Sequence, residues 1–72
     1  MEVRLFAMLR EGRGKVADVQ WREGMDGFQL LSELDIAPED AAIILINGTQ
    51  SKLDAKLKED DVVALFPAVS GG

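Results

Sequence analysis

The chain has 72 residues, room for one domain, and its 47% apolar content is typical of a folded globule rather than a disordered chain. It contains no cysteine, histidine or tyrosine, which excludes a thiol nucleophile, a thiolate metal site and an imidazole base. Eight basic against thirteen acidic residues give a net charge of −5, which argues against a nucleic-acid binder; it would suit a partner with a basic cleft, or simply aid solubility.

The same composition favours a cytoplasmic protein. No stretch is apolar over the length that crosses a bilayer, and residues 1–9 carry Glu2 and Arg4, unlike the apolar region of a signal peptide. The absence of cysteine agrees with this location.

Two alternating stretches at the start of the chain predict a β-hairpin. Residues 2–9 and 15–21 both show the two-residue period of a strand, and REGRG (10–14) between them supplies glycines and charges for the connection. On the first strand, the residues expected to face the core are Val3, Leu5, Ala7 and Leu9, and those expected to face outward are Arg4, Phe6 and Met8.

A helix is predicted over residues 26–35. Asp26 is a suitable N-cap, and Gln29 three residues later completes a capping-box pattern. The apolar stripe of this helix consists of Phe28, Leu30, Leu31 and Leu34. Pro38 ends the helical segment.

Three further strands are predicted after the helix. Residues 41–47 form a continuous apolar run, expected to be a central strand covered on both faces, and Asn47-Gly48 is a strong hairpin signal. Residues 49–53 can return as a short edge strand. A polar connection over 54–61, with Leu57 pointing inward, precedes the last strand, 62–66, which Pro67 ends.

The resulting order, β-β-α-β-β-β, predicts an α+β fold with a mixed sheet of four to five strands packed on one helix. The domain should cover residues 1–66, with an extended flexible tail over 67–72. The expected core comprises Val3, Leu5, Val19, Trp21, Phe28, Leu31, Leu34, Ile44 or Leu45, Leu57, Val63 and Leu65.

Nothing in the composition predicts a catalytic or metal site in this chain. The densest acidic cluster, Glu59-Asp60-Asp61, lacks the ligand spacing of a calcium loop and is interpreted as a solvated turn before the last strand. The serine and threonine hydroxyls have no histidine to activate them. We therefore expect a protein that is not an enzyme by itself and that binds no cofactor or metal.

The end of the chain, FPAVSGG (66–72), offers a different kind of chemistry. Pro67 favours an extended exit from the last strand, and six residues can reach about 20 Å. Gly71 and Gly72 have no side chains, so they could carry the Gly72 carboxylate through a narrow channel into another enzyme. A carboxylate activated as an acyl-adenylate could then be captured by sulfide or by an amine. A frayed, irrelevant end is the alternative.

The element order and the FPAVSGG end together resemble the ubiquitin-like β-grasp sulfur carriers of the MoaD/ThiS type, with the likeness nearest to the small subunit of molybdopterin synthase. The resemblance covers the whole chain and is strongest over residues 46–72. Two positions depart from the family pattern. Asp60 stands where a turn glycine is usual, and we expect it to tolerate the left-handed conformation; Ala68 replaces a second proline.

This resemblance implies that an E1-like adenylating enzyme (MoaB/MoeB/ThiF type) activates the Gly72 carboxylate with ATP. A persulfide donor then converts it to a thiocarboxylate. The large subunit of molybdopterin synthase (MoaE-like) would receive the carrier and its sulfur, so this chain is a cosubstrate and small subunit rather than a catalyst. The residues that give the tail its access are Gly71, Ser70, Val69 and Pro67.

The outer face of the sheet is the predicted partner-binding surface. In β-grasp folds the first and last strands pair at the sheet centre, which would place Phe6, Met8, Ala64 and Phe66 side by side.

Three alternative functions remain open from the residues alone. These are a carrier for thiamine or another pathway, a ubiquitin-like modifier conjugated through Gly72, and a β-grasp binding module with an unused tail.

Overall fold

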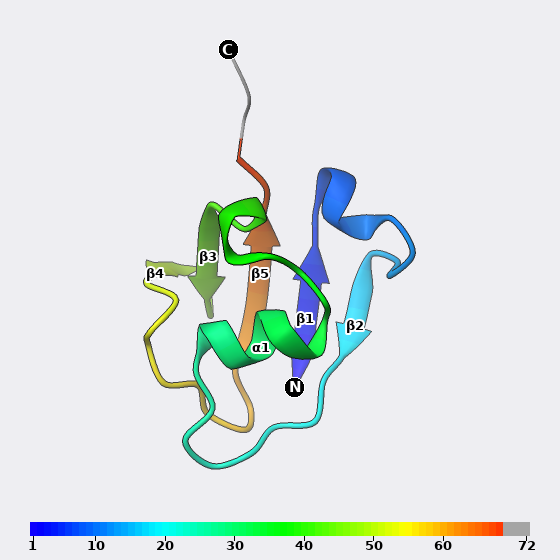
Figure 1. The fold of residues 1–72 in the computed structure, drawn as a ribbon. Helices are drawn as coiled ribbons and strands as arrows, with labels where there is room; N and C mark the ends of the chain where they lie inside the picture. Colours follow the sequence, from blue (N-terminus) through cyan, green and yellow to red (C-terminus); the bar gives the residue numbers. More distant parts are fainter. Residues whose placement is uncertain (69–72) are drawn as a thin grey trace.

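The computed structural model describes residues 1–68; residues 69–72 lie outside the described residues. Along the chain (Figure 1), the elements are β1 (Glu2–Leu5), the 3₁₀ helix η1 (Ala7–Arg10), β2 (Val16–Asp18), α1 (Gly27–Glu33), the 3₁₀ helix η2 (Pro38–Asp40), β3 (Ile43–Ile46), β4 (Thr49–Ser51) and β5 (Val62–Phe66). The predicted order of strands and helix is confirmed.

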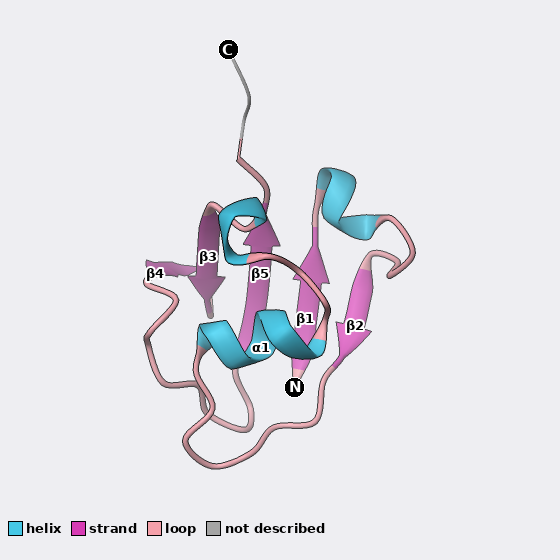
Figure 2. Cartoon of the chain, in the orientation of Figure 1, coloured by secondary structure: helices cyan, strands magenta, loops and turns pink. Residues whose placement is uncertain are grey.

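The strands form one mixed five-stranded sheet in the order β2-β1-β5-β3-β4. β1 runs parallel to β5, and the other neighbouring pairs are antiparallel. α1 crosses one face of this sheet (Figure 2). The architecture is the ubiquitin-like β-grasp fold, as expected, with the first and last strands paired at the centre.

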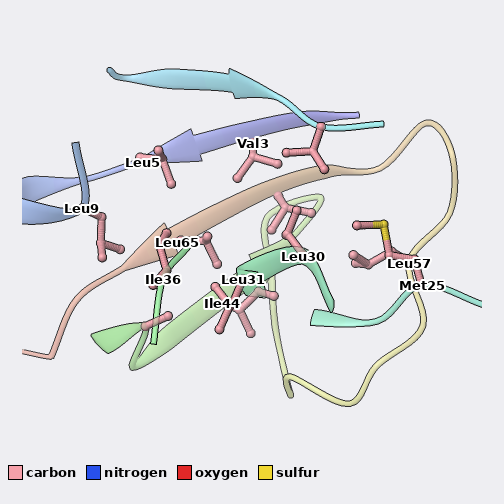
Figure 3. Close-up of a cluster of buried hydrophobic side chains, with 13 residues drawn as sticks. Val3, Leu5, Leu9, Met25, Leu30, Leu31, Ile36, Ile44, Leu57 and Leu65 are labelled. Atoms are coloured by element: carbon pink, nitrogen blue, oxygen red, sulfur yellow. The ribbon is translucent and has the colours of Figure 1, made fainter. Parts of the chain in front are cut away.

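The core lies between α1 and the sheet face beneath it (Figure 3). Val3 and Leu5 of β1 and Val63 and Leu65 of β5 are fully buried there. The other buried apolar residues are Leu9, Val19, Met25, Leu30, Leu31, Ile36, Ala41, Ile44 and Leu57. Each such leucine removed from water contributes roughly 1.5–3 kcal/mol, so this layer is the main stabilising term.

The first strand is shorter than its sequence period predicts. β1 ends at Leu5, and Ala7 adopts a φ of 55°, which breaks the extended conformation and starts η1. Leu9 still reaches the core through this turn, whereas Ala7 is exposed instead of facing inward. The prediction of one strand over 2–9 is therefore wrong, and Met8 lies on η1 rather than on a strand face.

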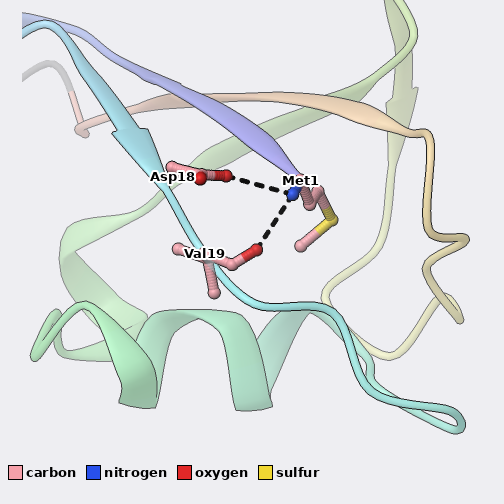
Figure 4. Close-up of polar contacts among 3 residues, drawn as sticks. All are labelled: Met1, Asp18 and Val19. Atoms are coloured by element: carbon pink, nitrogen blue, oxygen red, sulfur yellow. Dashed lines mark hydrogen bonds and ion pairs between the residues drawn. The ribbon is translucent and has the colours of Figure 1, made fainter.

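The second strand is also shorter, since β2 covers only Val16–Asp18 of the expected 15–21. Beyond it, the Val19 amide donates to the Met1 carbonyl at 3.0 Å. The Met1 ammonium donates to the Val19 carbonyl at 3.0 Å and to the Asp18 carboxylate at 3.3 Å (Figure 4). Trp21 has left the sheet by then; it is partly buried, and its indole N–H donates to the Leu57 carbonyl at 2.8 Å.

α1 begins as predicted, because the Asp26 carboxylate accepts a 3.0 Å hydrogen bond from the Gln29 amide. The predicted apolar stripe is wrong in one residue. The helix buries Gly27, Leu30 and Leu31, which are spaced by three and four residues, and this leaves Phe28 on the flank of the helix. The Phe28 side chain is 48% exposed and is not part of the core.

β3 forms the predicted hairpin with the edge strand β4. Asn47 and Gly48 have φ values of 52° and 83°, the positive values that a tight two-residue hairpin turn requires. Coverage on both faces of β3 is not observed among the described residues. Ile44 is buried beneath α1, whereas Ile43 points to the opposite face and is exposed.

The acidic turn before β5 differs from its interpretation as fully solvated. Glu59 and Asp60 are exposed, but Asp61 is 5% exposed. One Asp61 carboxylate oxygen accepts from the Lys58 amide at 2.8 Å, which closes the turn. Asp60 is not among the residues with positive φ, so the expected left-handed conformation at this position is also wrong.

Candidate functional site

The site predicted from the sequence is built at the C-terminal end of the central strand. β5 lies between β1 and β3, so its direction is set by neighbours on both sides. Phe66 is the last residue of β5, and Pro67 and Ala68 carry the chain beyond the sheet. The remaining predicted tail residues, Val69, Ser70, Gly71 and Gly72, lie outside the described residues.

Two aromatic rings meet at the point where the tail begins. The Phe6 and Phe66 rings are stacked, with centroids 4.2 Å apart and 10° between their planes. The Arg10 guanidinium carbon lies 5.4 Å from the centroid of the Phe6 ring, within cation–π distance. Arg10 is held there because its Nε donates to the Leu5 carbonyl at 2.8 Å. The predicted association of Phe6 with Phe66 is thus present, with an arginine added.

The register of β3 extends this apolar surface beyond the predicted residues. Ile43 pairs with Phe66, and Leu45 pairs with Ala64. Directly paired residues share a sheet face, so both lie on the face opposite α1. We call Phe6, Ile43, Leu45, Ala64 and Phe66 the outer-face cluster. The sequence contained a signal for its β3 half, because a strand as uniformly apolar as residues 41–47 has an apolar second face.

A charged pair borders the outer-face cluster on β1. Arg4 pairs with Ala64 across the two parallel strands and is exposed. Its Nε donates to the Glu2 carboxylate at 2.6 Å. A partner that covers the cluster would therefore also meet this pair. Met8, the fourth residue predicted for this surface, is 50% exposed on η1.

The start of β5 is fixed by a hydrogen-bonded group that sequence reasoning missed. The Asn47 side-chain amide donates to Asp61 at 2.8 Å, and its carbonyl oxygen accepts from the Val62 amide at 2.9 Å. The main-chain amide of Asn47 donates to the Val62 carbonyl at 2.8 Å. Asn47 thus ties the β3–β4 turn to β5, whereas its sequence signal indicated only a turn. These bonds hold the strand that presents the tail.

A single arginine joins the first hairpin to the end of the helix. Arg13 donates to the carbonyl oxygens of Leu34 and Asp35, both at 2.9 Å, and to those of Leu9 and Glu11, both at 3.2 Å. The bonds to Leu34 and Asp35 satisfy carbonyls that α1 leaves free at its C-terminus. They hold the η1 region, which carries Arg10, against the helix.

The described residues also bear on two other kinds of site. Within residues 1–68, no group of three or more acidic, histidine or cysteine side chains could hold a metal ion. In that same part of the chain, no helix has the length and apolarity needed to span a membrane. What the geometry offers is a rigid central strand, a stacked aromatic pair and a chain end that leaves beside them.

Comparison with known proteins agrees with this geometry. A family model for the ThiS family matches residues 3–72. Among solved structures, a putative molybdopterin converting factor subunit 1 from Pyrococcus furiosus is 28% identical, with a TM-score of 0.74, over 94% of this chain and 95% of that chain. SAMP1 from Haloferax volcanii is 28% identical, with a TM-score of 0.79, over 99% and 97% of the two chains.

A third solved structure shows the same fold at lower identity. It is the complex of subunits 1 and 2 of the molybdopterin-converting factor from Helicobacter pylori 26695. The matched chain is 24% identical, with a TM-score of 0.57, over 99% of this chain and 96% of that chain. Because the family model covers nearly the whole sequence, this chain belongs to the ThiS family of MoaD/ThiS-type ubiquitin-like sulfur carriers.

Proposed function

We propose that this protein carries sulfur for molybdopterin synthesis as a C-terminal thiocarboxylate. One observation carries the choice of pathway: the likeness to the Pyrococcus furiosus protein named as a molybdopterin converting factor subunit, which extends over 94% of this chain. Membership of the ThiS family supports the carrier role more broadly. The stacked aromatic pair at the root of the tail supports a function in which the chain end is delivered to a partner.

In the proposed cycle, an E1-like adenylating enzyme joins the Gly72 carboxylate to the AMP portion of ATP and releases pyrophosphate. A persulfide sulfur then displaces AMP and forms an acyl disulfide. A thiol reduces that disulfide and releases the Gly72 thiocarboxylate. This chain supplies the carboxylate and the docking surface, while ATP and the catalytic groups belong to the partner enzymes.

The second partner is a MoaE-like large subunit, on which the thiocarboxylate gives its sulfur to a pterin precursor and returns to a carboxylate. The Helicobacter pylori chain of the same fold is found in a complex with subunit 2 of its factor. We infer an equivalent pairing here, with the outer-face cluster against the partner. This surface suits the role because apolar patches of this kind mark protein interfaces.

Reconstitution tests the proposal. The full chain is incubated with an adenylating enzyme, ATP, a persulfide donor and a thiol, and its intact mass should show one oxygen exchanged for sulfur. The product is then offered either to a MoaE-like subunit with its pterin precursor or to the thiazole-forming step of thiamine synthesis. Sulfur transfer to the pterin supports the proposal. Transfer only to the thiazole, or conjugates of Gly72 with lysines of other proteins, would overturn it.

A further inference from the structure

A groove lies on the helix side of the molecule, on the opposite face from the outer-face cluster. Its volume is ≈ 440 Å³, and it is lined by Phe28 and Ser32 of α1 and by residues 35–38 in the connection to η2. This connection is held in place by the end of the helix. The Ile36 amide donates to the Leu31 carbonyl at 2.9 Å, and Arg13 donates to the Asp35 carbonyl. One wall of the groove, the connection to η2, is therefore hydrogen-bonded to α1 and to Arg13.

Phe28 is the unexplained side chain of this groove. Leu30 and Leu31 on the same helix are fully buried, whereas Phe28 is half exposed beside the apolar residues 36–38. A large aromatic side chain contributes little to the fold when so much of its surface stays in water. An aromatic wall beside a groove is instead typical of a surface that receives an apolar side chain.

The charge around the groove indicates which occupant fits. Residues 23–51 contain six acidic side chains and no lysine or arginine. Among the described residues, the basic side chains that contact this segment are Arg13, on the Leu34 and Asp35 carbonyls, Arg22, on Glu33, and Lys56, on the Gly24 carbonyl, so acidic groups still outnumber basic ones around it. Within residues 1–68, Glu33 is the one acidic side chain of this segment that forms an ion pair, with Arg22. Asp35 lines the groove. Glu39 and Asp40 are exposed in η2, whose first residue, Pro38, also lines the groove.

We propose that the groove is a second docking site, for a partner segment that carries an apolar side chain next to lysine or arginine. The apolar side chain packs against Phe28, and the basic residues face Asp35, Glu39 and Asp40. Because the groove and the outer-face cluster lie on opposite faces, one partner can hold the helix side while another binds the root of the tail. This inference does not depend on the chemistry at Gly72.

A pair of matched peptides tests the site on the full chain. One peptide has two leucines flanked by lysines, and the other has the same leucines flanked by glutamates. In amide NMR spectra, the lysine peptide should shift the signals of residues 28–37, and the glutamate peptide should leave them unchanged. The Phe28→Ala variant should bind the lysine peptide about tenfold more weakly, as for a truncated aromatic at an interface centre. Added salt should weaken the binding of the lysine peptide to the unchanged protein, because it screens the charges on both partners.

Val16→Ala is the matched control, because Val16 is an exposed apolar residue on β2, away from the groove. It should bind the lysine peptide as the unchanged protein does. Asp35→Asn combined with Glu39→Gln provides a second reading that leaves Phe28 in place, and it should also weaken binding. The proposal would be overturned if the two peptides bound equally, or if the shifts centred on Phe66. It would also be overturned if the Phe28→Ala variant kept its affinity, or if the shifts depended on protein concentration without peptide.

Discussion

The ring of Phe66, the last residue of β5, stacks on the ring of Phe6, the first residue after β1, at 4.2 Å. The two residues are sixty positions apart in the sequence and meet because β1 and β5 are parallel neighbours. Parallel pairing brings the C-terminal ends of both strands to the same edge. The stack therefore forms at the point where the chain leaves the sheet toward Gly72.

Replacing Phe66 with alanine should weaken binding to both the adenylating enzyme and the large synthase subunit. Phe66 is partly exposed on the outer face, and an aromatic residue buried at such an interface is typically worth about 2 kcal/mol or more. Phe6→Ala should have the same effect to a smaller extent. Calorimetric titration of each variant against each partner measures this.

Leu65→Ala is the control for the Phe66 variant, because Leu65 is the adjacent residue and is fully buried. It should lower the free energy of unfolding by about 2–5 kcal/mol, far more than Phe66→Ala. If melting curves show that both variants lose stability equally, the role of Phe66 is in the fold and the interface assignment is wrong.

Deleting Gly72, or replacing Gly71 with tryptophan, should abolish activation while the melting temperature stays unchanged. The predicted reason is that a narrow channel in the partner admits only a chain end without side chains. ATP–pyrophosphate exchange catalysed by the cognate adenylating enzyme reports the activation step. A truncated protein that still supports exchange would show that activation does not require Gly72.

Replacing Asp61 with alanine should lower the free energy of unfolding by about 1–3 kcal/mol. The change leaves the side-chain amide of Asn47 and the main-chain amide of Lys58 without their acceptor in a part-buried position. Asp60→Ala is the control, since Asp60 is exposed one residue earlier. Urea denaturation compares the two variants, and equal stabilities would mean that the Asp61 bonds contribute nothing.

Gly27→Ala tests two opposing effects in α1. Alanine is favoured over glycine in a helix by about 1 kcal/mol. A β-carbon at this position would lie 2.6 Å from the Leu53 carbonyl oxygen, and relieving such a clash typically costs about 1–3 kcal/mol. The clash involves backbone that hydrogen-bonds to Phe28, so we expect net destabilisation in a melting experiment. A raised melting temperature would show that the backbone around Leu53 can shift away from the new β-carbon at little cost.

Asp35→Gly should stabilise the protein by about 1 kcal/mol. Asp35 has a φ of 57° directly after the end of α1, a position that favours glycine, and its negative charge opposes the helix dipole there. Asp35→Asn separates the two causes, because asparagine tolerates the same backbone angle without the charge. Chemical denaturation of both variants measures how much the backbone angle and the charge each contribute to the free energy of unfolding. A destabilised Asp35→Gly variant would contradict this account.

The sequence by itself determined the order of the elements and indicated the chain end as the candidate site. Alternation of apolar residues, Asp26 before a helical stripe and Asn47-Gly48 between two strands are local signals. Local hydrogen bonds and side-chain spacing decide such features, and the structure reproduces them at Asp26 and Asn47. The end FPAVSGG likewise indicated a carrier because its resemblance to the family is a property of the residues alone.

Tertiary structure decided which side chains are buried and which meet. Phe28 fits the helical period as well as Leu31 does, but only the docking of α1 on the sheet determines which of them faces the core. The local sequence does not distinguish Asp61 from other acidic turn residues, because its hydrogen-bond donor, Asn47, lies fourteen positions away. β1 ends at Leu5 because a turn at Ala7 brings Leu9 into the core. Each of these outcomes depends on contacts between distant segments, which a local period does not contain.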